Sequence, residues 1–338
     1  MSTDTPRLSD HKALIFDVYG TLCDWETGIY NGLIPLLSRY SASKTWSRKE
    51  ALTAFNSVET DLQAQNPDML YSDLLSKVHE VLEQRLKALS GKESTTTTLE
   101  GDPATTLTAS SNGASTSADA TSSARAGSLT GGTGSPKSAN AEKHQAFGNS
   151  IKDWPVFPDS SEALHRLAKH FKLVVLSNVD HASFRHTHAL LSEGTSSPDI
   201  DIYSYPTSNP HKYWHPQETK GSKSPFSLVM TAQDTHCYKP ALGGFKDALE
   251  YIKNESALLG GSGAEDVTSQ VLSVAQSLPH DHEPANSLGM RSVWIDRQGA
   301  VTCNENPGGP SAPKKWTWRF ETLREMADAV EKELASTR

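Results

Sequence analysis

The sequence predicts an α/β protein in which a parallel sheet carries helices on both faces and a second, helical domain is inserted. Short apolar runs of strand length alternate with helical patterns, which is typical of a parallel sheet. A long stretch, residues 24–150, separates the first run from the second. The chain has 338 residues, and at about 150 residues per domain this length suits two domains.

Five apolar runs have the length and composition of buried strands. They cover residues 14–16, 172–178, 227–232, 271–276 and 292–296. Helical patterns lie beside them at residues 160–170, 244–253 and 284–288. In such a sheet the polar residues at the carboxyl ends of the strands should meet at one edge.

The inserted stretch shows helical periodicity. Large apolar residues recur at spacings of three and four within residues 33–37, 52–62 and 70–86. We therefore expect a core domain of residues 1–23 and 151–338, with a helical cap domain of residues 24–150.

Two polar stretches interrupt these domains. In residues 94–138, 21 of 45 residues are Ser or Thr and no aromatic residue occurs. Such a segment cannot bury enough apolar surface to offset its chain entropy, so we expect it to be disordered. Residues 193–223 contain four prolines and should form a long surface loop or a local extension.

Composition excludes several classes of function. The formal charge of −8 argues against a nucleic-acid-binding protein with a basic face. Three widely spaced cysteines offer neither a disulfide framework nor a CxxC metal site. We see no secretion signal and no apolar run long enough to span a membrane, so we expect a cytoplasmic protein. A homodimer is compatible with the sequence.

Polar residues stand at or after the carboxyl ends of four expected strands. They are Asp17 with Thr21, Ser177 with Asn178, Lys239, and Asp281. A carboxylate beside a lysine and hydroxyl donors is the arrangement expected of a carboxylate nucleophile. Taken singly, each element has a simpler reading, because an Asp after a strand is commonly a turn or cap residue and a Lys-Pro pair is commonly solvated surface.

Four segments resemble, in order, the motifs of the haloacid dehalogenase (HAD) superfamily, and most closely its 2-haloacid dehalogenase type II branch with its fungal members. The segments are Phe16-Asp-Val-Tyr-Gly-Thr-Leu22, Leu176-Ser-Asn-Val-Asp180, Tyr238-Lys-Pro240 and Ser277-Leu-Pro-His-Asp281. The resemblance implies a Rossmann-like core with a helical cap. It implies a hydrolase of a small-molecule substrate, with Asp17 as nucleophile, Lys239 as its charge partner and Asp281 beside them. Tyr19, Thr21, Ser177 and Asn178 would surround the nucleophile and substrate.

Two positions separate the branches of this superfamily. Its phosphatases place a general acid two residues after the nucleophile, where this chain has Tyr19, and an acidic metal ligand where it has Gln276. A halide leaves without a proton, and an amide is a poor ligand for Mg²⁺, so the resemblance favours carbon–halogen cleavage without a cofactor or metal. An Mg²⁺-dependent phosphatase and a non-catalytic binding protein remain alternatives.

The resemblance also has gaps. Characterised members carry a halide-binding arginine on a cap helix that reads Phe55-Asn-Ser-Val-Glu59 here, and Arg39 and Arg48 are only nearby. An aromatic hydroxyl that follows the motif lysine is replaced by Phe245. His211 and His215 have metal-ligand spacing, but flanking prolines and the lack of a carboxylate between them argue against zinc. His280 and His282 should flank Asp281 on its loop.

Overall fold

The computed structural model describes residues 6–96, 136–194, 199–259, 267–305, 309, 311 and 313–336. Its centre is a six-stranded parallel sheet with the order β3-β2-β1-β4-β5-β6, which confirms the predicted α/β class. The strands are β1 (Ala13–Phe16), β2 (Lys172–Ser177), β3 (Phe226–Thr231), β4 (Val271–Ala275), β5 (Arg291–Ile295) and β6 (Trp318–Phe320). The first five lie within a residue or two of the predicted runs, whereas β6 was not predicted.

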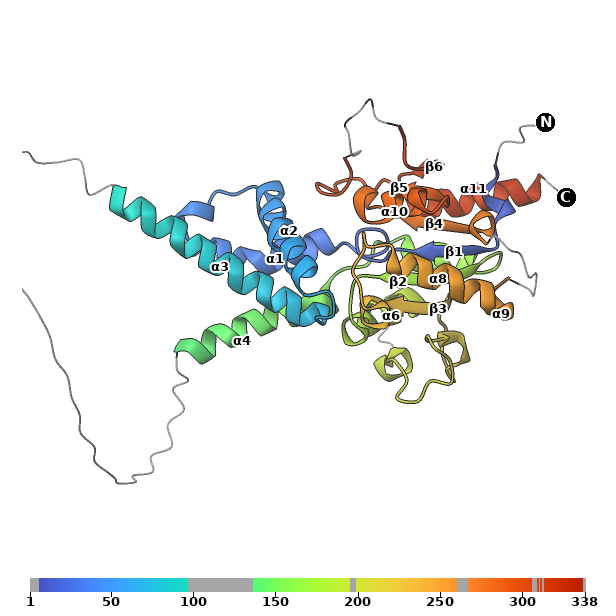
Figure 1. Ribbon diagram of the computed structural model, residues 1–338, viewed down its shortest axis with the longest axis horizontal. Coiled ribbons are helices and arrows are strands. Elements are labelled where there is room, and N and C mark those ends of the chain that lie inside the picture. Colours follow the sequence, from blue (N-terminus) through green and yellow to red (C-terminus); the bar gives the residue numbers. More distant parts are fainter. Residues whose placement is uncertain are drawn as a thin grey trace, which may run out of the picture.

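Helices cover both faces of the sheet, as Figure 1 shows. They are α5 (Ser160–Leu167), α6 (His181–Glu193), α7 (Ala232–Thr235), α8 (Gly243–Asn254), α9 (Ser256–Leu259), α10 (Glu283–Ser287) and α11 (Leu323–Ala335). Neither α6 nor α11 was predicted. Each begins at a polar cap: Asp180 accepts a hydrogen bond from Ser183 N at 2.8 Å, and Thr322 forms a reciprocal capping box with Glu325.

Strand β1 is buried on both faces and divides the core into two clusters. Leu14 and Phe16 pack with α5, α6 and α11, whereas Ala13 and Ile15 pack with α8 to α10. Alternate residues of a strand point to opposite faces, so every residue of this central strand is apolar.

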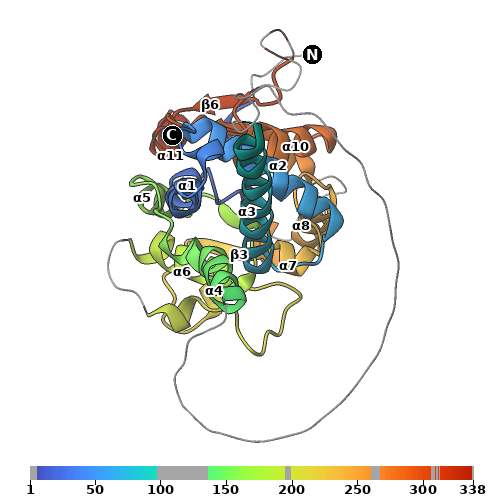
Figure 2. The same ribbon diagram turned by 90° about the vertical axis from the view of Figure 1, so that its left-hand side faces the viewer.

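Four further helices lie to one side of the sheet (Figure 1). They are α1 (Trp25–Leu37), α2 (Arg48–Gln65), α3 (Tyr71–Thr96) and α4 (Pro136–Gly148). Figure 2, with these helices toward the viewer, shows α3 through the middle of the group. We treat α1 to α4 as the cap and the sheet with its helices as the core.

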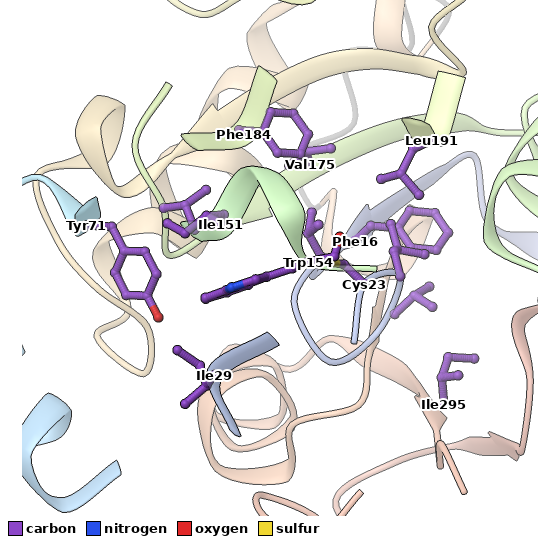
Figure 3. Close-up of a cluster of buried hydrophobic side chains, with 14 of the residues drawn as sticks. Phe16, Cys23, Ile29, Tyr71, Ile151, Trp154, Val175, Phe184, Leu191 and Ile295 are labelled. Carbon is purple, nitrogen blue, oxygen red and sulfur yellow. The ribbon is translucent and has the colours of Figure 1, made fainter. Parts of the chain in front are cut away.

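Cap and core share one hydrophobic cluster, part of which is shown in Figure 3. Trp154, on the chain's return to the sheet, packs edge-to-face on Tyr19 with 5.5 Å between ring centroids. Its indole also covers Gly28 of α1, where a Cβ would lie 2.3 Å from the ring. A glycine is therefore needed at position 28 for α1 to approach the core this closely.

The structure corrects the edges of the predicted Ser/Thr-rich segment. Residues 94–96 belong to the end of α3 and residues 136–138 to the start of α4, not to a disordered segment. Extending a formed helix fixes one residue per hydrogen bond, which is far easier than nucleation, so polar composition did not stop α3 at residue 93. Residues 97–135 lie outside the described residues.

The polar stretch from residue 193 is a local extension rather than a plain surface loop over its described part. Residues 199–223 contain two short 3₁₀ helices, Ile200–Tyr203 and Pro216–Glu218. Tyr203, Tyr213 and Trp214 are buried, and Trp214 pairs with Val229 of β3.

None of the helices that the structure describes is long and apolar enough to cross a membrane.

Candidate active site

Asp17 stands directly after β1, where the chain enters a tight turn. The backbone N–H groups of Leu22 and Cys23 both donate to Val18 O, at 2.7 and 3.0 Å. Gly20 within this turn has φ of 105°, and a Cβ there would lie 3.0 Å from the Gln276 side chain. The turn thus needs glycine both for its backbone conformation and for space.

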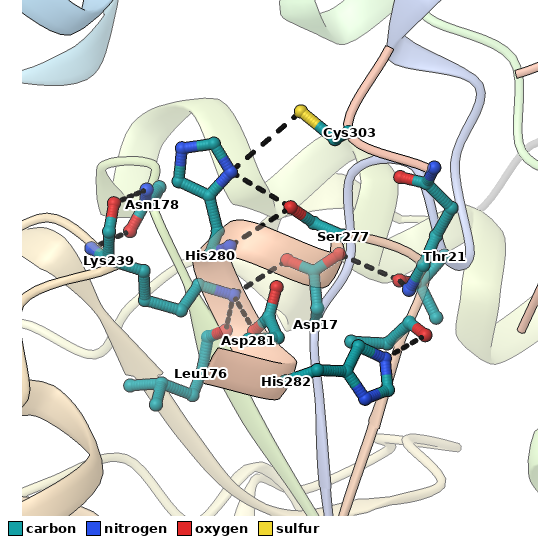
Figure 4. A network of polar contacts seen from close by, with 12 residues as sticks. Asp17, Thr21, Leu176, Asn178, Lys239, Ser277, His280, Asp281, His282 and Cys303 are labelled. Carbon is teal, nitrogen blue, oxygen red and sulfur yellow. Dashed lines mark hydrogen bonds and ion pairs between the residues drawn. The ribbon is translucent and has the colours of Figure 1, made fainter. Parts of the chain in front are cut away.

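Lys239 joins the two predicted carboxylates (Figure 4). Its Nζ donates to Asp17 Oδ1 at 2.7 Å, to Asp281 Oδ1 at 2.8 Å and to the backbone oxygen of Leu176 at 2.9 Å. The Lys239 residue is only 4% exposed. The three N–H groups of its ammonium are all used by these acceptors.

The ionisation of this group follows from burial and charge. Burial opposes the charged form of Lys239, but Asp17 and Asp281 outweigh it, so the pKa of Lys239 is raised. Burial raises the pKa of Asp281 to about 7, although Lys239 acts in the opposite direction. Asp281 Oδ2 has no hydrogen-bond partner within the described residues, so this oxygen can still accept a proton or a water.

Two of the predicted substrate-binding residues contact the charged group. Asn178 holds the Lys239 backbone from both sides: its Nδ2 donates to Lys239 O at 3.0 Å, and its Oδ1 accepts from Lys239 N at 2.7 Å. Thr21 Oγ1 donates to Asp17 Oδ2 at 2.7 Å and accepts from Gln276 N at 2.8 Å. Thr21 is fully buried, contacts Asp17 and is not among the residues that line the cavity described below.

A cavity of about 210 Å³ opens beside Asp17. Ser177 lines it with a buried hydroxyl that has no hydrogen-bond partner within the described residues. Tyr19 also lines it, and its hydroxyl is hydrogen-bonded to Thr187 Oγ1 at 3.0 Å. Burial raises the pKa of Tyr19 well above its usual value, so its phenol stays protonated. Of the predicted site residues, all but Thr21 line this cavity.

Comparison with known proteins places the fold. No protein-family model and no curated protein sequence matches the chain. Among solved structures, it is similar to YfnB from Bacillus subtilis, described as a HAD-hydrolase bound to magnesium, with 12% identity over 96% of this chain and 100% of that one and a TM-score of 0.50. It is also similar to the defluorinating L-2-haloacid dehalogenase Rha0230, with 14% identity, coverage of 97% and 100% and a TM-score of 0.50. The L-2-haloacid dehalogenase RSc1362 gives 14% identity, coverage of 95% and 99% and the same TM-score.

The chain has the HAD fold. This confirms the fold expected from the four motifs.

The cap contributes a wall of the HAD-fold cavity that sequence reasoning missed. Asn56, Glu59, Thr60 and Gln63 of α2 line it together with Tyr71, the first residue of α3. The spacing of three, one and three residues places the four polar side chains on one face of α2. This polar stripe was readable from the sequence, but nothing local indicated that it faces a cavity.

The two arginines considered for halide binding lie elsewhere. Arg48 pairs with Glu26 at 3.4 Å and Arg39 with Glu83 at 3.1 Å, and neither lines the cavity. Lys239 is the only Lys or Arg among the cavity-lining residues in the described part of the chain.

The two histidines beside Asp281 have different surroundings. His280 lines the cavity, with its Nδ1 2.8 Å from Ser277 Oγ, and burial lowers its pKa to about 4. His282 is fully buried between Ala275 O and the Ser292 hydroxyl, at 3.0 and 2.8 Å. His280 therefore reaches the cavity, whereas His282 tethers the loop to the sheet.

His211 and His215 lie in the extension, far from Asp17 in the sequence. The structure brings the carboxylate of Glu255 within 4.8 Å of both rings, a neighbour that sequence spacing did not show. Each ring already has a partner: His211 Nε2 lies 3.0 Å from Glu218 Oε2, and His215 Nε2 lies 2.7 Å from Tyr251 Oη. These contacts account for the position of both histidines.

Proposed function

We propose that this chain is a hydrolase that attacks its substrate with Asp17 through an aspartyl-ester intermediate, in the manner of a 2-haloacid dehalogenase. One observation supports this most strongly. Asp17 lines the cavity with one oxygen bound by the Lys239 ammonium and the other by the Thr21 hydroxyl, each at 2.7 Å. A cation and a hydroxyl donor favour the ionised, oriented carboxylate that nucleophilic attack requires.

The proposed reaction has two steps. An Asp17 oxygen forms a bond to the substrate carbon while the carbon–halogen bond breaks, and the halide leaves with the bonding electrons. Water then adds to the Asp17 carboxyl carbon, the alcohol product leaves, and the carboxylate is regenerated with release of a proton. Asp281 is suited to receive that proton, because burial raises its pKa to about 7 and its Oδ2 is unpartnered within the described residues.

The donor set of this site fits Mg²⁺ poorly. Both Asp17 oxygens and one Asp281 oxygen already accept hydrogen bonds from the chain. Gln276 supplies a neutral amide whose Nε2 donates to Thr302 O at 3.2 Å. Tyr19, with its protonated phenol, also offers no carboxylic acid to protonate an alkoxide leaving group. We therefore propose a metal-independent reaction at carbon rather than phosphate-ester hydrolysis.

The test measures two products from two substrates. Chloride release from 2-chloropropionate and phosphate release from an aryl phosphate are assayed with EDTA and with added Mg²⁺. We expect chloride release that EDTA does not slow. Magnesium-stimulated phosphate release without chloride release would overturn the proposal. Release of neither chloride nor phosphate would favour the binding-protein alternative.

The nucleophile is tested separately with Asp17→Asn and a matched control, Asp61→Asn, an exposed position on α2. Asp17→Asn should abolish turnover, and the control should not. In a single turnover in H₂¹⁸O with enzyme in excess, the product oxygen should come from the protein and the label should enter Asp17. Labelled product in that first turnover would show direct attack by water instead.

A further inference from the structure

The cap wall of the cavity presents a carboxylate. Glu59 of α2 lines the cavity and is held by the Tyr71 hydroxyl, which donates to its Oε1 at 2.6 Å. This is the one hydrogen bond of the Glu59 side chain within the described residues. Glu59 is half-buried, and Tyr71 is buried. Oε2 of Glu59 is therefore left as an acceptor on the cavity side of α2.

Among the described residues that line the cavity, no Lys or Arg is free to balance a negatively charged substrate group at this wall. Lys239 is the only Lys or Arg lining the described cavity, and its ammonium already binds Asp17, Asp281 and the Leu176 carbonyl oxygen. The uncharged residues around Glu59 are Asn56, Thr60 and Gln63. A substrate carboxylate placed against α2 would meet a like charge without a compensating cation.

We propose that the substrate presents a hydrogen-bond donor to Glu59, and that this donor is a hydroxyl, an amide N–H or an ammonium group. Glu59 would then select against substrates that carry a carboxylate in that position. This inference rests on the proposed function, because attack by Asp17 places the reacting carbon and its substituents in the cavity that α2 also lines. Glu59 is a specificity-determining residue in this proposal, and it takes no part in bond making at Asp17.

Glu59 presents this like charge only above its pKa. Burial raises the pKa of Glu59 to about 7, and the Tyr71 hydrogen bond only partly opposes the shift. A half-buried carboxyl in this condition gains from a further donor, because an added hydrogen bond favours its charged form.

The experiment compares two substrates that differ only in this group. Chloride release from 2-chloropropionamide and from 2-chloropropionate is measured for the wild type, for Glu59→Gln and for the control Gln63→Ala, which changes the same wall without changing its charge. We expect the wild type to prefer the amide in kcat/KM by at least tenfold. Glu59→Gln should lower kcat/KM for the amide about tenfold and raise it for the acid, whereas Gln63→Ala should shift both in the same direction.

Glu59→Gln keeps an oxygen that can accept from Tyr71, and a thermal melt checks that the variant folds. An unchanged amide-to-acid ratio in the folded variant would overturn the inference while leaving the hydrolase proposal intact. If neither substrate releases chloride, the hydrolase proposal fails, and the inference is decided by binding. Propionamide and propionate are then titrated against the wild type and Glu59→Gln by tryptophan fluorescence, since Trp25 lines the cavity. Equal affinities in the wild type, or a preference that Glu59→Gln leaves unchanged, would overturn the inference.

Discussion

Replacing Lys239 with Met tests the charged group at the centre of the cavity. The substitution removes one cation that is within 2.8 Å of two carboxylates and leaves Asp17 and Asp281 buried together. Breaking a single buried ion pair by removing one partner costs about 3–5 kcal/mol of unfolding free energy. Two carboxylates lose their partner here, but one of them can take up a proton, so we expect a loss of about 3–5 kcal/mol at pH 8.

The pH dependence makes this prediction specific. In the variant, each carboxylate disfavours the charge of the other and no cation offsets this, so the pKa of Asp281 should rise above the value of about 7 that it has in the wild type, further from the value of about 3.9 in the unfolded chain. A folded state that binds the extra proton gains stability as the pH falls, by about 1.4 kcal/mol per pH unit per proton. The deficit relative to the wild type should therefore shrink between pH 8 and pH 5.

The assay is urea unfolding followed by circular dichroism at pH 5, 6.5 and 8. The double variant Lys239→Met/Asp281→Asn is the control, because it removes one of the two carboxylates that have lost their cation. Its free energy of unfolding at pH 8 should exceed that of Lys239→Met by at least about 1 kcal/mol. A deficit below about 1 kcal/mol at pH 8, or one that does not change with pH, would refute this account of the site.

Three further predictions concern single contacts. Thr21→Val removes the donor to Asp17 Oδ2 and the acceptor of the Gln276 backbone N–H, so the free energy of unfolding in urea should fall by about 1–3 kcal/mol. An unchanged unfolding midpoint would count against these contacts. Gly148→Ala should lower the free energy of unfolding by about 1–3 kcal/mol and lower the thermal midpoint, because the new Cβ would lie 2.2 Å from the Ser72 carbonyl oxygen where α4 meets α3. A thermal midpoint equal to that of the wild type would contradict this packing. Burial lowers the pKa of His188 to about 3, so the unfolded chain binds a proton that the folded chain refuses, and stability should fall as the pH drops from 6.5 towards 3. His188→Gln should flatten that slope by about 1.4 kcal/mol per pH unit, and an identical slope in both proteins would refute the assignment.

Much of the sheet could be predicted because its strands are buried on both faces and appear as continuous apolar runs. Strand β6 could not, because Trp318–Phe320 is a short edge strand whose residues are partly exposed. The start of α3 shows the limit of periodicity. Leu70 continues the apolar spacing of this helix but precedes it and is 40% exposed. Spacing identifies a face of a helix, not the residue at which the helix begins.

The candidate site was predictable to the extent that it depends on strand ends. Asp17, Lys239 and Asp281 follow three different strands, and parallel pairing brings them together whatever the side chains between them do. The orientation of a side chain within a turn is not set in this way. Thr21 and Ser177 are both hydroxyl residues beside strand ends, yet Thr21 points to Asp17 and Ser177 lines the cavity. Thr21 lies in the turn around Gly20, whereas Ser177 is the last residue of β2.

The charges of the cavity are divided between cap and core. On the core wall, Lys239 balances Asp17 and Asp281 through one hydrogen bond to each and donates a third to Leu176 O, so this group can hold its geometry before any substrate arrives. On the cap wall, Glu59 has only the Tyr71 hydroxyl and meets no free cation among the described cavity residues. A substrate group that donates to Glu59 would therefore stabilise the bound substrate and also the position of α2 beside the core. In the proposed function, core residues carry out the reaction and Glu59 of the cap selects the substrate. Of the two walls, only the cap wall needs the substrate to provide a partner for its charge.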